Sequence, residues 1–175
     1  LPPSAMQAAW RRTLRKVSTW VKSQVARSVA KETRIPRKVL VQRIYFFLRS
    51  RDSGKVWLGL NAIEAHRLGS VRDLGGGGAG FAGSGGVVVT DSRKTGPRRY
   101  YQNAWTMHKR NPNGPIYSRI GKARTPYGIV KVDWGGAGEK AFREAAAMVE
   151  ERLLIVLRQE VNYEIHKALG HGRKT

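Results

Sequence analysis

A long helical pattern covers residues 4–33, SAMQAAWRRTLRKVSTWVKSQVARSVAKET. Apolar residues recur every three or four positions, at Met6, Trp10, Leu14, Val17, Val21, Val25 and Val29. This spacing predicts one long amphipathic helix, with Arg and Lys on its other faces. Ser4 is suited to cap its start, and Pro36 ends it. A short helix is expected next, from Arg37 to about Ile44.

A second apolar stripe runs through residues 138–169 and predicts another long helix. Its members are Phe142, Ala146, Val149, Leu153, Val156, Val161, Ile165 and Ala168. Gly170 is a suitable C-cap. Six acidic and four basic residues lie between positions 139 and 164. This helix is therefore mildly acidic, whereas the first one is basic.

The part between the helices, residues 45–132, has the pattern of β-structure. Strands are expected at 45–49 and 55–61 around the turn Asp52-Ser53-Gly54, and again at 87–90, 105–109, 116–120 and 129–132. The glycine-rich run 75–86 cannot form regular structure by its own propensity, and we interpret it as a flexible loop or arm. The order predicts a single α+β domain over residues 1–175, with long N- and C-terminal helices packed on a central antiparallel β-sheet.

The charge of the chain points to a polyanionic partner. Lys and Arg number 33 and Asp and Glu number 12, so the formal net charge is +21. Residues 92–132 hold ten basic residues and no acidic one, with Tyr100 and Tyr101 beside Arg98 and Arg99. Ordinary solvated surfaces mix both signs, so this stretch favours phosphate contacts without sequence readout. The candidate DNA or polyanion contacts are Arg93, Lys94, Arg98, Arg99, Lys109, Arg110, Arg119, Lys122 and Arg124.

Other classes of function find little support in the residues. The chain has no cysteine, which excludes disulfides and thiolate chemistry. His66, His108, His166 and His171 have no metal-ligand spacing, and the Gly-x-Gly-x-x-Gly matches in 75–86 lack a following helix. We expect no enzymatic activity, catalytic residue, metal, cofactor or small-molecule substrate. With no apolar run of membrane-spanning length and no leader, we expect a soluble protein made inside the cell, without membrane contact.

Two stretches resemble the phage minor tail protein Z family, the tail-completion proteins of long-tailed bacteriophages. Residues 24–40, QVARSVAKETRIPRKVL, are similar to its N-terminal signature. The second stretch is similar to the segment of that family that leads to a Val-Lys-Val strand. It comprises residues 103–105, Arg119, Arg124-Thr125-Pro126-Tyr127 and 129–132. The resemblance covers roughly residues 15–50 and 100–169. Tyr127 stands where the family has an aliphatic residue, and the run 75–86 has no counterpart there.

The resemblance implies a structural virion protein assembled in the host cytoplasm. Such a protein completes the head-proximal end of the tail, at the neck. It forms a ring, a hexamer, around the channel for genomic DNA, with the tail terminator and the head–tail connector as partners. A ring needs two complementary patches per subunit, which we expect from the basic N-terminal and mildly acidic C-terminal helices. The expected subunit or connector contacts are Arg27, Lys31, Arg34, Arg37 and Lys38, and the arm that orders on a neighbour includes Gly75, Gly78, Gly80, Gly83 and Gly86.

Two further interpretations of the charge stay open at this point. The first is a free-standing, sequence-nonspecific nucleic-acid-binding protein whose affinity falls steeply with salt. The second is a ribosome-associated basic protein, against which the regular helical stripes and the acidic last helix weigh. Oligomer size distinguishes the ring from both.

Overall fold

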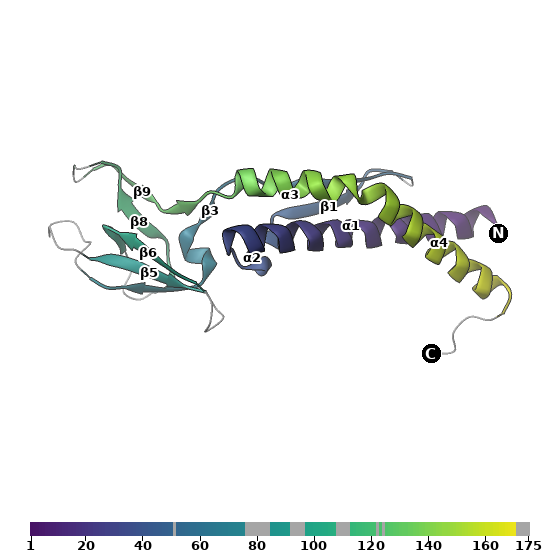
Figure 1. Ribbon diagram of the computed structural model, residues 1–175, viewed down its shortest axis with the longest axis horizontal. Coiled ribbons are helices and arrows are strands. Elements are labelled where there is room, and N and C mark those ends of the chain that lie inside the picture. The colour runs from purple at the N-terminus through teal and green to yellow at the C-terminus, as the bar shows by residue number, and fades with distance from the viewer. Residues whose placement is uncertain are drawn as a thin grey trace. The chain divides into compact units, whose positions relative to one another are not determined.

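A computed structural model describes residues 1–50, 52–75, 85–91, 97–107, 113–121, 123 and 125–170 (Figure 1). Its helices and antiparallel strands confirm the α+β class. We expected one domain, and the structure divides the chain into two compact units. Unit 1 comprises 1–32, 40–60 and the chain from Gly136 on, and unit 2 comprises 33–39 and 61–135.

Helix α1 (Pro3–Thr33) follows the expected bounds closely. Val17, Val21, Val25 and Val29 are buried as the stripe predicts, but Met6 is exposed and the small Ala9 and Thr13 take the buried positions near the N-terminal end. The Thr13 hydroxyl donates to the Ala9 carbonyl oxygen at 2.9 Å, which satisfies it without solvent. The helix ends where Arg34 adopts a φ of +56°, two residues before Pro36. Helix α2 (Arg37–Val41) follows.

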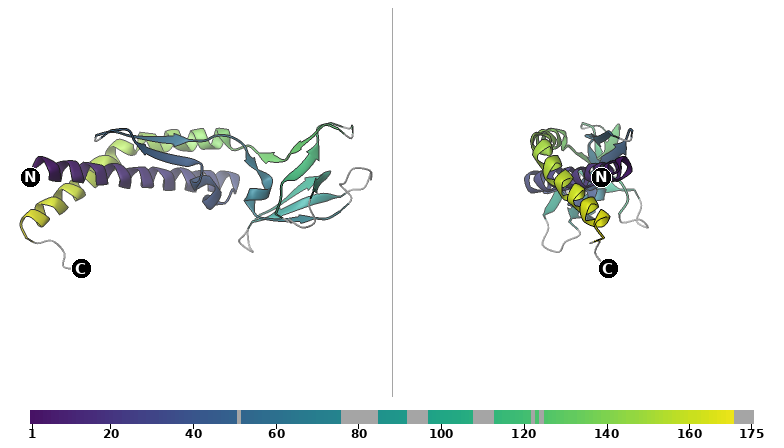
Figure 2. Two further views of the ribbon diagram at one scale, coloured as in Figure 1. Left: turned by 180° about the vertical axis from the view of Figure 1, so that it is seen from behind. Right: turned by 90° about the vertical axis from the view of Figure 1, so that its right-hand side faces the viewer.

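The expected C-terminal helix is two helices, α3 (Gly135–Ala147) and α4 (Val149–Ala168). The break falls at Met148, whose N–H donates to Ala145 in a tighter turn than the α-helix uses. Neither Gly nor Pro marks the break in the sequence. In Figures 1 and 2, α3 runs alongside α1, and α4 then crosses it. This change of direction places Glu160 and Glu164 against α1.

The predicted hairpin forms from β1 (Ile44–Leu48) and β2 (Gly54–Leu58) in unit 1. Ile44, Phe46 and Leu58 lie on the more buried side of this ribbon. Tyr45, Phe47, Lys55 and Trp57 share the other, exposed side, which we call the hairpin face. Near the turn, the Trp10 indole N–H of α1 donates to the Asp52 carbonyl oxygen at 2.9 Å.

In unit 2 the described strands form three small sheets, where we expected one central sheet. Strands β4 (Ser70–Asp73), β5 (Gly86–Thr90) and β6 (Arg98–Gln102) make one, and β7 (Ala104–Thr106), β8 (Ile116–Arg119) and β9 (Tyr127–Ile129) another. Short strands β3 (Ile63–Glu64) and β10 (Lys131–Val132) pair with each other, and a 3₁₀ turn, η1 (Ala65–Leu68), follows β3. The largest fully buried side chain described is Trp134, whose indole N–H donates to the Asn61 carbonyl oxygen at 3.0 Å.

Candidate nucleic-acid interface

The sheet β7–β8–β9 has two chemically different faces. Side chains alternate along each strand, and the register places Trp105, Tyr117 and Ile129 side by side and Arg119 opposite Tyr127. We call this set of five residues the aromatic face. The opposite face carries Ala104 and Ile116, which are fully buried. The core therefore lies behind the sheet, and the aromatic face points away from it.

Three rings on the aromatic face contact one another. The centroids of Trp105 and Tyr117 are 6.5 Å apart with the planes close to parallel, and Tyr127 meets both rings edge-on at 5.8 Å. Such edge-to-face pairs are favourable. They hold the rings in fixed orientations, while Tyr127 remains 46% exposed. The result is a preformed, partly exposed aromatic surface.

The charge of this face is positive. Among the residues of its three strands, Arg119 is the only one that carries a charge. In the sequence, Lys109 and Arg110 precede β8, and Lys122 and Arg124 separate β8 from β9. Those four candidates, together with Arg93 and Lys94, lie outside the described residues.

Arg98 and Arg99, both on β6, have different surroundings. Arg98 is exposed. Arg99 is partly buried, and its Nη2 donates to the Thr33 carbonyl oxygen at 2.8 Å, so this side chain is engaged within unit 2. Burial raises the pKa of the neighbouring Tyr101 hydroxyl, and the charge of Arg99 opposes that rise. Of the predicted contacts that the structure describes, Arg98 and Arg119 are thus the two whose side chains are not engaged in this way.

The five residues expected at a subunit or connector interface are all exposed. Arg27 and Lys31 are one helical turn apart on α1, in unit 1. Arg34, Arg37 and Lys38 belong to unit 2. Their exposure is compatible with the expected interface, which stays a prediction.

One residue of the expected arm is part of the core instead. Gly86 is the first residue of β5 and is buried. A Cβ built there would lie 2.6 Å from the Tyr101 carbonyl oxygen, so the close approach of β5 and β6 requires glycine. Gly75, with a φ of +79°, follows β4. Gly78, Gly80 and Gly83 lie outside the described residues.

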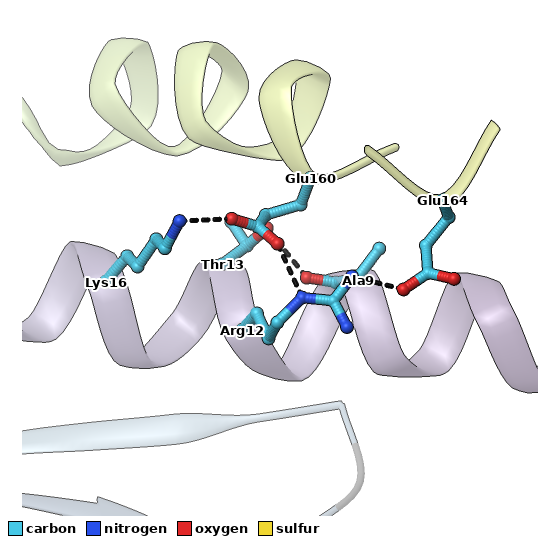
Figure 3. A network of polar contacts seen from close by, with 6 residues as sticks. All are labelled: Ala9, Arg12, Thr13, Lys16, Glu160 and Glu164. Atoms are coloured by element: carbon cyan, nitrogen blue, oxygen red, sulfur yellow. Dashed lines mark hydrogen bonds and ion pairs between the residues drawn. The ribbon is translucent and has the colours of Figure 1, made fainter. Parts of the chain in front are cut away.

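A charge cluster that the sequence did not reveal joins α1 to α4 (Figure 3). Arg12 contacts Glu160 through Nε and Glu164 through Nη2, each at 2.5 Å. Lys16 Nζ lies 2.5 Å from the other Glu160 oxygen. The Arg12 guanidinium also lies 5.2 Å from the centre of the Tyr163 ring. We call Arg12, Lys16, Glu160 and Glu164 the Arg12 cluster.

The Arg12 cluster pairs part of the charge of the two oppositely charged helices within one chain. We expect basic and acidic helices to pair between neighbouring copies, and for the other charges of α1, such as Arg27 and Lys31, this stays a prediction. Glu160 and Glu164 are only 4% and 5% exposed. Burial opposes ionisation of Glu160, but hydrogen bonds from Lys16 and Arg12 outweigh burial and lower the pKa of that carboxyl. The pKa of Arg12 is raised despite burial of its guanidinium, because of the same carboxylates.

The part of the chain that the structure describes shows no group of three or more His, Asp or Glu placed to hold a metal ion. His66 Nε2 approaches Glu64 at 3.6 Å, and burial lowers the pKa of this histidine. Among the described helices, none is both long and apolar enough to cross a membrane.

Comparison with known proteins places the chain in no group. No family model, no curated protein and no solved structure matches it.

Proposed function

We propose that this chain is a non-enzymatic tail-completion protein, a ring subunit at the head-proximal end of a phage tail. In this proposal the ring is a hexamer that surrounds the DNA channel between the tail terminator and the head–tail connector. The subunit is made in the host cytoplasm and ends in the virion neck. The observation that carries the proposal is that unit 1 exposes large apolar side chains on two different elements, the hairpin and α4.

The first surface is the hairpin face. Phe47 is 53% and Trp57 47% exposed. The Tyr45 ring lies 5.7 Å from Trp57 and 6.3 Å from Phe47, measured between centroids, so the three form one contiguous patch. A contiguous aromatic patch on a surface is typical of an interaction site rather than of scattered exposed residues.

The second surface is the outer side of α4. Leu154 is 59% exposed, and Ile165 and Leu169 are exposed as well. At 100° per residue these three lie within about 60° of one another around the helix. Val156, Glu160 and Glu164 form the buried side of the same helix. The same sector of α4 also carries the exposed Arg158 and Glu151, so the outer side is a mixed surface on which large apolar side chains lie among charged ones.

Two different patches on one unit are what a ring needs. A heterologous contact joins one patch of a subunit to another patch of its neighbour, and repetition closes the ring. We propose that the hairpin face of one copy packs on the α4 surface of the next. This contact differs from the expected helix–helix charge pairing, part of which the Arg12 cluster already makes within the chain.

The test is the absolute mass of the purified chain by light scattering, at low and high salt and with duplex DNA. We expect a discrete hexamer of the 19.5 kDa chain. Leu154→Glu and Trp57→Glu should each reduce it to smaller species. Gln159→Glu is the matched control, because it adds the same charge to α4 at about 140° from Leu154 and removes no apolar side chain.

A second candidate is a free-standing, sequence-nonspecific nucleic-acid-binding protein, favoured by the aromatic face beside Arg119. A monomer under all three conditions that coats DNA and releases it in salt would support this candidate and contradict the ring. A hexamer that both apolar-surface variants leave intact would contradict the proposed contact.

A further inference from the structure

The aromatic face combines exposed ring surface with a positive charge, and these two features can bind an unpaired base and its phosphate. Trp105 and Tyr127 present ring surface that the protein core does not use, since the core lies behind Ala104 and Ile116. Arg119 is the residue opposite Tyr127 in the register, so its charge accompanies the rings on the same side of the sheet. A ligand that satisfies both must offer flat π-surface and negative charge.

A single strand offers both, whereas a duplex offers only one. In a duplex the base faces are covered by their stacked neighbours, and phosphates alone are presented. In a single strand the bases are free to stack on aromatic side chains placed along a basic surface. Every base has a π-face, so such binding is tolerant of sequence. This agrees with the absence of a sequence-reading motif from the chain.

We propose that the aromatic face binds single-stranded nucleic acid, with unpaired bases stacked on Tyr127 and Trp105 and a neighbouring phosphate at Arg119. This inference goes beyond the assembly role, because a monomer suffices for it and it concerns strands rather than the duplex in the channel. It also explains why aromatic residues occupy this sheet face, where solvent exposure alone favours polar ones.

Fluorescence anisotropy at about 0.15 M salt tests the proposal with three labelled probes of equal length. The probes are oligothymidylate, an abasic deoxyribose-phosphate oligomer and a blunt-ended duplex. We expect oligothymidylate to bind at least about tenfold more tightly than the abasic oligomer, because each stacked base contributes substantially. Equal affinity for the two would overturn the proposal, since charge alone would then account for binding.

The variant Tyr127→Ala should lower affinity for oligothymidylate about tenfold and leave affinity for the abasic oligomer unchanged. Tyr127→Phe should retain binding, because the ring remains. The matched control is Tyr163→Ala, which removes a similarly exposed tyrosine from α4, outside the aromatic face and the hairpin face. A loss at Tyr163 and none at Tyr127 would overturn the proposal.

Arg119→Ala should weaken binding of both single-stranded probes, since both carry phosphates. Unchanged circular dichroism and melting temperature of each variant establish that the fold is intact. Because one chain holds the whole site, the ratio of affinities between variant and unmodified chain, taken in the same oligomeric state, does not require ring formation. If the chain is a monomer and Tyr127→Ala weakens strand binding, only the ring proposal is wrong. If the chain is a hexamer and Tyr127→Ala has no effect, only this inference is wrong.

Discussion

Glu160 combines deep burial with two cationic partners, and its ionisation stabilises unit 1. One oxygen of its carboxylate forms an ion pair with Arg12, and the other forms an ion pair with Lys16. Because its pKa is lower in the folded protein than in the unfolded chain, the stabilisation is complete above the unfolded value, near pH 4.5. It is lost as pH falls through the lower folded pKa, when the buried carboxyl takes up a proton.

The substitution Glu160→Gln should therefore lower the free energy of unfolding by about 2 kcal/mol at neutral pH, since the charged acceptor of two cations is lost. As pH falls below 4.5, the difference from the unmodified chain should shrink toward zero. Urea unfolding followed by the helical circular dichroism signal, at several pH values, measures this. Glu151→Gln, at an exposed position of α4, is the control. A difference that grows in acid would contradict the assignment.

Among the strands, the pairing of β5 with β6 depends on a residue without a side chain. At Gly86 an added Cβ would approach the Tyr101 carbonyl oxygen to 2.6 Å and a Tyr100 ring carbon to 2.7 Å. Real Cβ atoms do not come so close to backbone, so one strand would have to shift. Gly136, on α3, has nothing within 4 Å of the same constructed atom.

We expect Gly86→Ala to destabilise the chain by about 1–3 kcal/mol through overpacking. Gly136→Ala should instead stabilise it by about 0.5 kcal/mol, because alanine loses less backbone entropy in a helix. Thermal unfolding of the two variants beside the unmodified chain provides the comparison. Equal and small effects at both positions would show that β5 and β6 do not pair closely.

For the molecule as a whole, the net charge of +21 dominates encounters with DNA. Basic residues nevertheless divide into exposed ones, such as Arg98, and engaged ones, such as Arg99. The exposed ones release counterions from DNA when they meet phosphates, and the engaged ones contribute to the fold.

Duplex DNA affinity, measured against salt concentration, should separate the two roles. Arg98→Ala is expected to reduce the slope of log K against log salt by about one. Arg99→Ala is expected to leave the slope unchanged and to lower stability by about 1–2 kcal/mol, because the hydrogen bond from Arg99 to the Thr33 carbonyl oxygen is lost. The reverse pattern, with the slope altered only by Arg99→Ala, would contradict this division.

Much of the architecture was predictable because its causes are local. The valines from Val17 to Val29 recur at helical spacing, and the turn Asp52-Ser53-Gly54 joins two strands, so α1 and the hairpin were expected close to their true bounds. Strand β6 was not expected, since its sequence RRYYQ has no apolar alternation. It forms because it pairs with β5. The break at Met148 also has no breaker residue.

For the candidate interface, composition was enough to indicate a basic region, because counting charges requires no coordinates. Which of those charges are exposed depends on tertiary contacts. Arg12 and Glu160 lie 148 positions apart, so no local pattern could show that carboxylates of the last helix pair with cations of the first one within the same chain. Likewise, Trp105, Tyr117 and Tyr127 share one face only because strand register aligns three separate segments. Periodicity states which side of an element is apolar, and only packing decides what covers that side.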